Sequence, residues 1–284
     1  MLSVAVFGQV KKQFSVESKE KCDRVELCIK SKTGNCFIRP SQNAEILNVY
    51  SNQDLENYAH SLTNEIKNRI CLVNLALKQD ASRGVGEKIS YQIMGNDVNT
   101  ITDKFWKIYL TDNKPYSLDL SYGLGNANID LSGLAIQKLK VKTGSADVHV
   151  GYTQGLENKV DMDTFLIKVD MGSLSVKNIS LSRSKTVIAE VGFGNILLDF
   201  SDKPLVHYDV IGSVGAGNMV ILMPGDDIPV LVKISESWLC SVNLSKGLKK
   251  VSANTFANAS YIKNPKDAIT FDLDVSMGKI TFKE

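Results

Sequence analysis

One recurring pattern, from residue 116 to the end of the chain, limits the possible folds more than any other feature. A short strand with alternating apolar residues reaches a glycine-containing turn, and a second alternating strand follows, as in Lys138–Val141, Thr143–Ser145 and Ala146–Val150. A period of two directs one side of each strand inward. We expect each tight corner to need the positive φ that glycine allows.

The turn residues mark the repeat. The glycines at these turns are Gly125, Gly144, Gly172, Gly194, Gly217 and, in the closing copy, Gly278. Asn126, Asn195 and Asn218 directly follow a turn glycine, and asparagine tolerates left-handed backbone. A spacing of about 22 residues lies in the range of stacked repeat architectures, in which each unit buries its apolar face against its neighbours. We therefore predict an all-β fold, a single-stranded β-solenoid over 115–284, with Gly125, Gly194 and Gly217 in equivalent corners.

The first hundred residues are less regular. We expect a β-rich N-terminal domain over 9–114, which either packs against the solenoid or begins the same stack. Strand-like runs occupy 25–29, 36–38, 44–49, 70–77, 88–94 and 105–110, and 112–115 form a turn. Leu55, Tyr58, Leu62 and Ile66 follow one another at helical spacing, which predicts a short helix or a long ordered excursion. Residues 155–163 and 244–267 are expected to be loops.

The N-terminus predicts export. Met1–Gly8 is apolar and ends in small residues, as at the end of a secretory signal peptide, so we expect the mature protein to begin near Gln9. A charged leading region is absent, and the true start would then lie upstream. The alternative is an ordinary buried first strand. Export would place the protein outside the cytoplasm, in the periplasm, at the cell surface or in the medium.

The five cysteines do not resemble a metal site. Cys22, Cys28, Cys36, Cys71 and Cys240 include no Cys-x-x-Cys spacing and have no nearby histidine. In an exported chain, a pair among Cys28, Cys36 and Cys71 is a candidate disulfide. Buried free thiols are the alternative, and the odd count leaves at least one cysteine unpaired within the chain.

Familiar catalytic and cofactor motifs are missing from the sequence. His60, His149 and His207 lie far apart, and Gly84–Lys88 lacks the spacing of a phosphate-binding loop. The order of glycines in Gly212–Gly217 is G-x-x-G-x-G, and an apolar strand rather than a helix follows it. The sequence therefore predicts no catalytic residues, no cofactor and no metal.

Aspartates beside the repeats leave one catalytic alternative open. They are Asp119, Asp130, Asp147, Asp170, Asp199, Asp209, Asp272 and Asp274. A stacked row of carboxylates would suit Ca²⁺ binding or sugar cleavage. The other interpretation is a solvated outer face shared with lysines.

Charge and hydropathy restrict the partners. The 33 basic and 31 acidic residues give a net charge of +2, which offers no electrostatic reason to expect nucleic acid or an anionic membrane. The longest apolar runs, such as Met219–Met223, are far shorter than the ~20 residues of a membrane span. The sequence shows no dense aromatic patch, and we expect Trp106 and Trp238 to lie in the core or to cap an end.

The recurring Gly-x-Gly-Asn and Thr-Gly-Ser turns between alternating strands resemble those of the toast-rack β-solenoid family of bacterial envelope proteins, which includes adhesin-like domains. Leu118–Val150 and Phe271–Phe282 show the resemblance best. It covers 115–284 well, 22–50 loosely and little of 51–114. The resemblance implies a single-stranded β-solenoid without known catalytic residues. Some relatives are membrane-anchored parts of envelope-stress circuits, but no such anchor is evident in this chain.

These observations favour a non-catalytic, extracytoplasmic structural or interaction protein of adhesin-like type. Two alternatives are an accessory component of an envelope-stress or transport system and a carbohydrate-active enzyme with stacked aspartates. A protein or a cell-surface polysaccharide is the expected partner. Self-association through the solenoid ends is a further prediction, since we expect Ile280–Phe282 to form an end strand.

Overall fold

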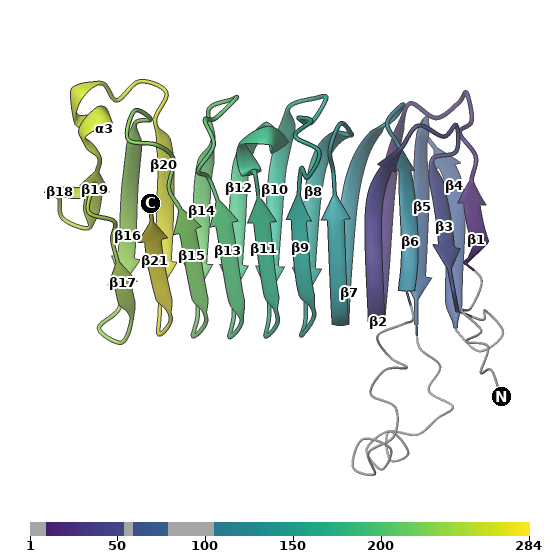
Figure 1. The fold of residues 1–284 in the computed structure, drawn as a ribbon, viewed down its shortest axis with the longest axis horizontal. Coiled ribbons are helices and arrows are strands. Elements are labelled where there is room, and N and C mark those ends of the chain that lie inside the picture. Colours follow the sequence, from purple (N-terminus) through teal and green to yellow (C-terminus); the bar gives the residue numbers. More distant parts are fainter. Residues whose placement is uncertain (1–9, 54–58, 79–104) are drawn as a thin grey trace, which may run out of the picture.

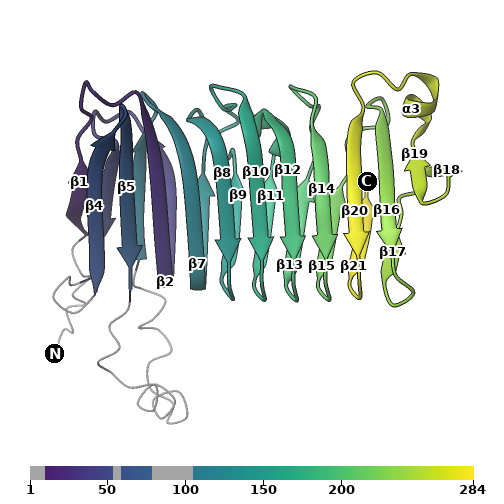
Figure 2. The ribbon, with the colours of Figure 1, turned by 180° about the vertical axis from the view of Figure 1, so that it is seen from behind.

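The computed structural model of the protein describes residues 10–53, 59–78 and 105–284. Strands stack side by side into two facing walls, and the chain crosses between the walls at tight corners along one edge and at longer loops along the other (Figures 1 and 2). Most strand pairs are parallel, as expected when each coil repeats the course of its neighbour, and the antiparallel pairs lie towards the two ends of the stack. This arrangement confirms the predicted all-β solenoid.

Both walls have a continuous ladder of strands. In spatial order, the first wall contains β4 (His60–Lys67), β5 (Ile70–Leu77), the first half of β2 (Arg24–Ser41), the first half of β7 (Pro115–Asp130), β8 (Ala135–Thr143), β10 (Met162–Val169), β12 (Ser184–Val191), β14 (Asp209–Val214), β20 (Ile269–Val275) and β16 (Val230–Glu236). The second wall contains β1 (Lys11–Val16), β3 (Leu47–Ser51), β6 (Phe105–Thr111), the second halves of β2 and β7, β9 (Asp147–Gly151), β11 (Ser173–Lys177), β13 (Asn195–Asp199), β15 (Asn218–Leu222), β21 (Lys279–Lys283) and β17 (Ser241–Asn243).

The core lies between the walls. Strict alternation puts Val187, Ala189 and Val191 of β12 inward, and all three are buried. On the facing wall, Ile196 and Leu198 of β13 are likewise buried. Since aliphatic and aromatic residues occupy these inward positions in every coil, the apolar core runs through the whole stack.

The order of coils in space differs from their order in the chain at both ends. Near the N-terminus, β2 lies between β5 and β7 in the first wall and between β6 and β7 in the second. The strands on both sides of residue 115 are therefore hydrogen-bonded into one stack. A domain boundary at 114/115 remains a prediction about folding units, because the sheet has no break there.

The C-terminal end shows the same kind of insertion. The final strands β20 and β21 lie between β14–β15 and β16–β17, so β21 pairs with β15 on one side and β17 on the other (Figure 1). The prediction that Ile280–Phe282 is an end strand is therefore wrong. Instead β17 ends the second wall, and the hairpin of β18 (Lys249–Ser252) and β19 (Thr255–Ala257) covers part of β16.

Three predictions about local structure need correction. Leu62 and Ile66 lie in β4, which pairs antiparallel with β5, so no helix covers 60–67. The stretch 244–267 is not a simple loop, because it contains β18, β19 and the short helix α3 (Ala259–Lys263). The loop predicted over 155–163 is shorter, because β10 begins at Met162. A 3-10 turn, η2 (Ile179–Ser182), follows β11 farther along the chain.

Other predictions were correct or lie outside the described residues. The strand over 70–77 is confirmed, and so is the 105–110 run, which β6 extends by one residue. The predicted signal segment 1–8, the helical-spacing residues Leu55 and Tyr58, the Gly84–Lys88 loop and the 88–94 run lie outside the described residues. Among the described residues, no helix has the length and apolarity needed to cross a membrane.

The corner glycines are required by close stacking more than by backbone conformation. Gly125 has a φ of 111°, but Gly194 is not among the described glycines with positive φ, so the expected reason for that glycine is wrong. A Cβ added at Gly194 would overlap the carbonyl oxygen of Gly172 and lie 2.6 Å from Cγ1 of Val169. The preceding coil therefore lies too close to leave room for a side chain at Gly194.

The register places most of the predicted corner residues in one row. Gly125, Gly172, Gly194, Gly217 and Gly278 occupy equivalent positions, each directly before the first residue of the second-wall strand. Gly144 does not belong to this row, because Ala146 takes the equivalent position in its coil. The asparagines stack beside the glycines: Nδ2 of Asn126 donates to Asn35, and Nδ2 of Asn218 donates to Asn195.

Candidate functional site

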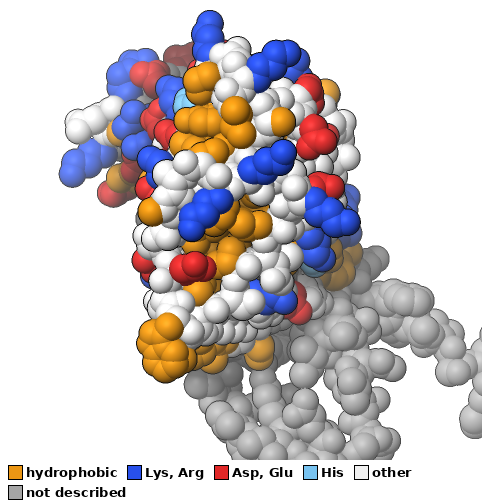
Figure 3. All heavy atoms as spheres, turned by 90° about the vertical axis from the view of Figure 1, so that its left-hand side faces the viewer, with side chains coloured by type: hydrophobic (Ala, Val, Ile, Leu, Met, Phe, Trp, Pro, Cys, Tyr) orange, Lys and Arg blue, Asp and Glu red, His pale blue; other side chains and the backbone are white. Residues whose placement is uncertain are grey.

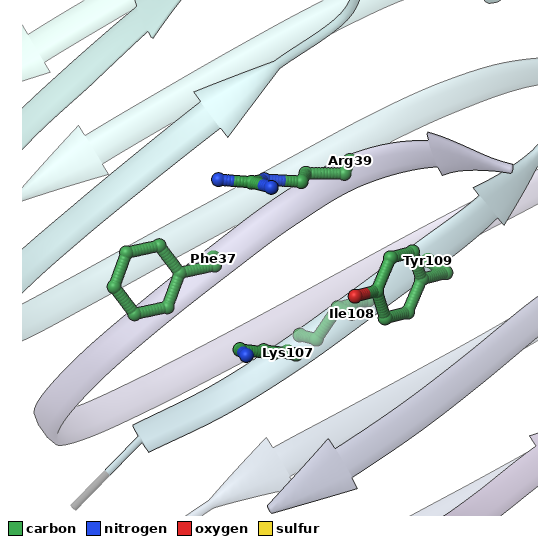
Figure 4. Close-up of a pocket in the computed structure, with 5 residues that line it drawn as sticks. All are labelled: Phe37, Arg39, Lys107, Ile108 and Tyr109. Carbon is green, nitrogen blue, oxygen red and sulfur yellow. The ribbon is translucent and has the colours of Figure 1, made fainter.

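A shallow hollow on the outer face of the second wall is the candidate binding site. It has a volume of about 100 Å³ and is lined by Phe37 and Arg39 of β2 and by Lys107, Ile108 and Tyr109 of β6 (Figure 4). Alternation explains the arrangement, because Ile38 and Ile108 point into the core while their neighbours point outward. We call Phe37, Arg39, Lys107 and Tyr109, together with Tyr50 and Phe105, the aromatic–basic patch.

Strand register interleaves the rings and cations of this patch. Parallel pairing sets Phe37 beside Lys107 and Arg39 beside Tyr109. Antiparallel pairing sets Tyr50 on the other side of Lys107. Aromatic side chains and cations therefore alternate across three neighbouring strands.

The aromatic rings contact one another edge to face. The ring centroids of Phe37 and Phe105 are 6.5 Å apart, and those of Tyr50 and Tyr109 are 5.7 Å apart. Nζ of Lys107 lies 4.8 Å from the centroid of the Phe105 ring, within cation–π range. These contacts hold the patch together without a carboxylate.

The patch carries unneutralised positive charge. Over the described ranges 10–53, 59–78 and 105–284, no carboxylate lies within ion-pair distance of Arg39 or Lys107. Arginine binds a carboxylate or phosphate with two parallel hydrogen bonds, and the half-buried rings offer apolar surface to a sugar. The patch is chemically suited to an anionic saccharide.

Sequence analysis missed this patch, and the expectation of no aromatic clustering was wrong for this part of the surface. Its residues come from three separate segments, 37–39, 50 and 105–109. The parallel pairing of β2 with β6, which lie about 70 residues apart in the chain, brings them together. A possible signal was the alternation of Phe105, Lys107 and Tyr109 along one strand.

The aspartates do not form the stacked row that sugar cleavage would need. Asp119 is in register with Lys140, whose Nζ lies 2.6 Å from its carboxylate. Asp272 lies in the same cross-strand row as Asp119 and Lys140. Three strands stand between Lys140 and Asp272, and none of them places a carboxylate in this row. Asp274 lies two residues farther along β20 and lines a shallow hollow with Asp170 and Glu190, whereas Asp199 lies on the opposite wall. In the described part of the chain, no group of three or more His, Cys, Asp or Glu side chains could hold a metal ion.

Asp130 is the one buried aspartate of this set, and its role is structural. Burial opposes its ionisation, but hydrogen bonds from Ser132, Thr153 and Gln154 outweigh that effect and lower the pKa of the carboxyl group. These bonds join the turn after β7 to the loop after β9. Asp130 therefore holds two loops together.

The histidines also remain apart. Nδ1 of His149 lies 2.7 Å from Oγ of Ser175, and Nε2 of His207 lies 3.8 Å from Asp209. His60 contacts the Phe14 ring at the opposite end of the stack. Ser175 and His149 are a hydroxyl and an imidazole in contact, but among the described residues no carboxylate is hydrogen-bonded to His149 to complete a catalytic triad.

The cysteines correct the predicted pairing. Cys22 forms a disulfide with Cys71, although the candidates were Cys28, Cys36 and Cys71. Cys28 points outward from β2 and Cys36 points into the core, so the two cannot approach each other. Burial raises the pKa of the Cys36 thiol to about 12.

The two tryptophans differ. Trp106 is fully buried in the core, as expected, but Trp238 is 90% exposed at a corner. The prediction for Trp238 was therefore wrong. The Gly212–Gly217 segment forms the end of β14 and a corner, as its sequence indicated.

Three solved structures are similar to this chain at low identity. A "putative cell adhesion protein" from Clostridium sporogenes has 15% identity and a TM-score of 0.44, with 97% of this chain and 99% of that chain covered. A "putative adhesin" from Bacteroides fragilis has 12% identity and a TM-score of 0.33, with 97% of each chain covered. A "putative lipid binding protein" from Parabacteroides distasonis has 9% identity and a TM-score of 0.35, with 97% of this chain and 96% of that chain covered. These values are too low to transfer a ligand or an activity.

No curated protein matches the chain significantly. A family model does: the one described as "N-terminal domain of toast_rack, DUF2154" matches residues 7–166. The match includes 51–114, where the sequence resemblance was weakest, and it covers more than half of the 284 residues. The chain belongs to the toast-rack family.

Proposed function

We propose that this protein is a non-catalytic, adhesin-like binding module that acts outside the cytoplasm, and that the aromatic–basic patch contacts an anionic polysaccharide. The observation that carries the proposal is the pair of unneutralised cations, Lys107 beside the ring of Phe37 and Arg39 beside the ring of Tyr109. Charge would select an acidic polymer, and the rings would pack on its sugar faces. The patch residues lie on paired strands, so little backbone conformational entropy would be lost on binding.

Two other observations support parts of the proposal. The Cys22–Cys71 disulfide favours an oxidising compartment, because disulfides rarely persist in the cytosol. The separation of Asp119 from Asp272 and Asp274 disfavours the alternative of a sugar-cleaving enzyme. The accessory role in an envelope-stress or transport system has no specific structural feature in its favour.

Binding of the full chain to polygalacturonate, with neutral dextran as the comparison polymer, tests the proposal. We expect wild type to bind the acidic polymer and the double variant Arg39→Gln/Lys107→Gln to lose at least tenfold in affinity. Phe37→Ala/Tyr109→Ala is expected to weaken binding at high salt as well, because the rings contribute an unscreened contact. Lys177→Gln changes an exposed lysine on the same wall and serves as the control.

Two results would contradict the proposal. Equal binding by wild type and the Arg39→Gln/Lys107→Gln variant would remove the patch as the contact. Release of new sugar ends from the polymer would show that the protein is an enzyme.

A further inference from the structure

The tips of the tight corners form a row along one edge of the molecule. Each corner has one apex residue directly before the stacked position, and backbone hydrogen bonds link successive corners. The amide of Phe193 donates to Asp170 at 2.7 Å, and the amide of Met277 donates to Gly215 at 2.7 Å. Coil by coil, the apex residues are Thr33, Leu124, Ser145, Met171, Phe193, Ala216, Met277 and Leu239, with Trp238 directly before the last.

Most of these apex residues are large, apolar and exposed to solvent. Phe193 is 75% exposed and Met171 66%, and the other large apex residues are more than half exposed. Tight turns usually contain Gly, Asn, Asp or Ser at such positions. We call Leu124, Met171, Phe193, Met277, Trp238 and Leu239 the apolar ridge. Viewed from the β16–β17 end, apolar side chains are visible at the lower edge of the molecule, where the corners lie, and also over the middle and upper part of this end face (Figure 3).

The opposite edge, where the longer loops lie, is strongly charged. Its exposed charged residues include Glu157, Lys159, Asp202, Lys203, Asp226, Asp227, Lys263 and Lys266. Leu156, Leu205 and Ile262 are also exposed there, but they are dispersed among these charges. In the described part of the molecule, exposed apolar side chains thus line the edge with the tight corners, and charged side chains dominate the edge with the longer loops.

We propose that the apolar ridge docks on a lipid bilayer surface, with its side chains inserted at the headgroup boundary and the charged edge facing away. This inference is separate from the polysaccharide patch and does not depend on it. Trp and Phe favour the bilayer interface, where an apolar body and a polar surrounding are both satisfied. The corners form one row, with neighbouring strands about 4.8 Å apart. The tips can therefore enter the same membrane plane together.

The shape of the ridge favours lipid over a protein partner. It is a narrow line of projecting corner tips, so a protein would need a long matching groove, whereas a bilayer surface adapts to each tip. A second copy packed ridge to ridge would set one line of projecting tips against another, which gives poor shape complementarity.

The charges near the ridge are of both signs, so the proposed docking does not depend on anionic lipid. Lys168 and Glu190 form an ion pair of 2.8 Å just above the corners, and Asp170 lies at a corner itself. Positive and negative groups are thus mixed beside the apolar tips. Apolar insertion, rather than headgroup charge, would drive the docking.

Vesicles of phosphatidylcholine alone are the probe, used with the full chain. We expect wild type to float with the vesicles and its tryptophan emission to shift to shorter wavelength. Trp238 is exposed while Trp106 is fully buried, so the shift would report on the ridge. The variant Met171→Ser/Phe193→Ser/Trp238→Ser is expected to lose at least tenfold in vesicle partitioning. These side chains are exposed, so its melting temperature should change little.

The matched control is Leu156→Ser/Leu205→Ser/Ile262→Ser, which removes three exposed apolar side chains from the opposite edge. We expect it to bind vesicles like wild type. Absence of wild-type binding, or equal losses in the ridge and control variants, would overturn the proposal. A ridge-dependent dimer in sedimentation, without vesicle binding, would assign the ridge to a second copy and would also overturn it.

Discussion

Nδ2 of Asn218 donates a hydrogen bond to Oδ1 of Asn195 over 2.9 Å, although 23 residues separate the two in the chain. Each asparagine directly follows a stacked glycine, Gly217 or Gly194. The amide ladder forms because successive corners have the same shape and lie directly over one another. The same close approach leaves no room for a side chain at the glycines.

Gly194→Ala is expected to destabilise the protein by about 1–3 kcal/mol, the usual cost of overpacking. The added Cβ would overlap the Gly172 carbonyl and crowd Val169. Urea unfolding of this variant beside Phe193→Ala checks the prediction, because Phe193 shares the corner but is exposed. Equal stability of Gly194→Ala and Phe193→Ala would rule out close stacking as the reason for the glycine.

Removal of the Cys22–Cys71 disulfide by the double change to Ala should cost about 2–4 kcal/mol in the free energy of unfolding. The bond joins residues 49 apart and limits the unfolded chain. Chemical denaturation with and without reductant measures the loss, with Cys28→Ala as the control. If reductant leaves wild type as stable as before, the bond does not contribute as expected.

Amides of β21 should exchange with deuterium more slowly than those of β17. β21 has a strand on each side, whereas β17 is the last described strand of its wall. Interior strands open only with large parts of the fold, but edge strands fray locally. Peptide-resolved hydrogen exchange distinguishes the two, and faster exchange in Lys279–Lys283 than in Ser241–Asn243 would contradict the inserted order.

Asp130 should stabilise the fold near neutral pH and lose this effect in acid. Its pKa is lowered in the folded state, so its contribution is fully present above the unfolded value of about 3.9 and disappears as the pH falls through the folded value. We therefore expect Asp130→Ala to melt below wild type at pH 7 and the difference to shrink on acidification below about pH 4. Asp202→Ala, at an exposed loop, is the control. A difference that is constant with pH would show that the carboxylate charge is not involved.

Local sequence determined the strands and the corners. Alternation in Ile70–Leu77 and Phe105–Leu110 sufficed to place two strands, because a period of two divides inward from outward residues without reference to any partner. The corner glycines could be found for a similar reason, since each stands between two such runs. The all-β solenoid follows from these local signals and their repetition.

Tertiary structure decided which strands are neighbours. β2 lies between β5 and β7, and β21 lies between β15 and β17, although the chain reaches these strands in a different order. The inward faces of the coils are similarly aliphatic, so alternation alone cannot tell one neighbour from another. Leu62 and Ile66 show the same limit, because pairing of β4 with β5 overrode their helical spacing.

The proposed surfaces depend on that neighbour order. Phe37 and Lys107 meet only because β2 is inserted beside β6, and Trp238 extends the ridge only because β16–β17 follows β20–β21 in space. The sequence by itself determined the repeating unit, since its period and glycines are local properties. Only the tertiary structure decided the patch, the ridge and the Cys22–Cys71 bond, because each joins residues that the parallel stacking of distant coils brings together.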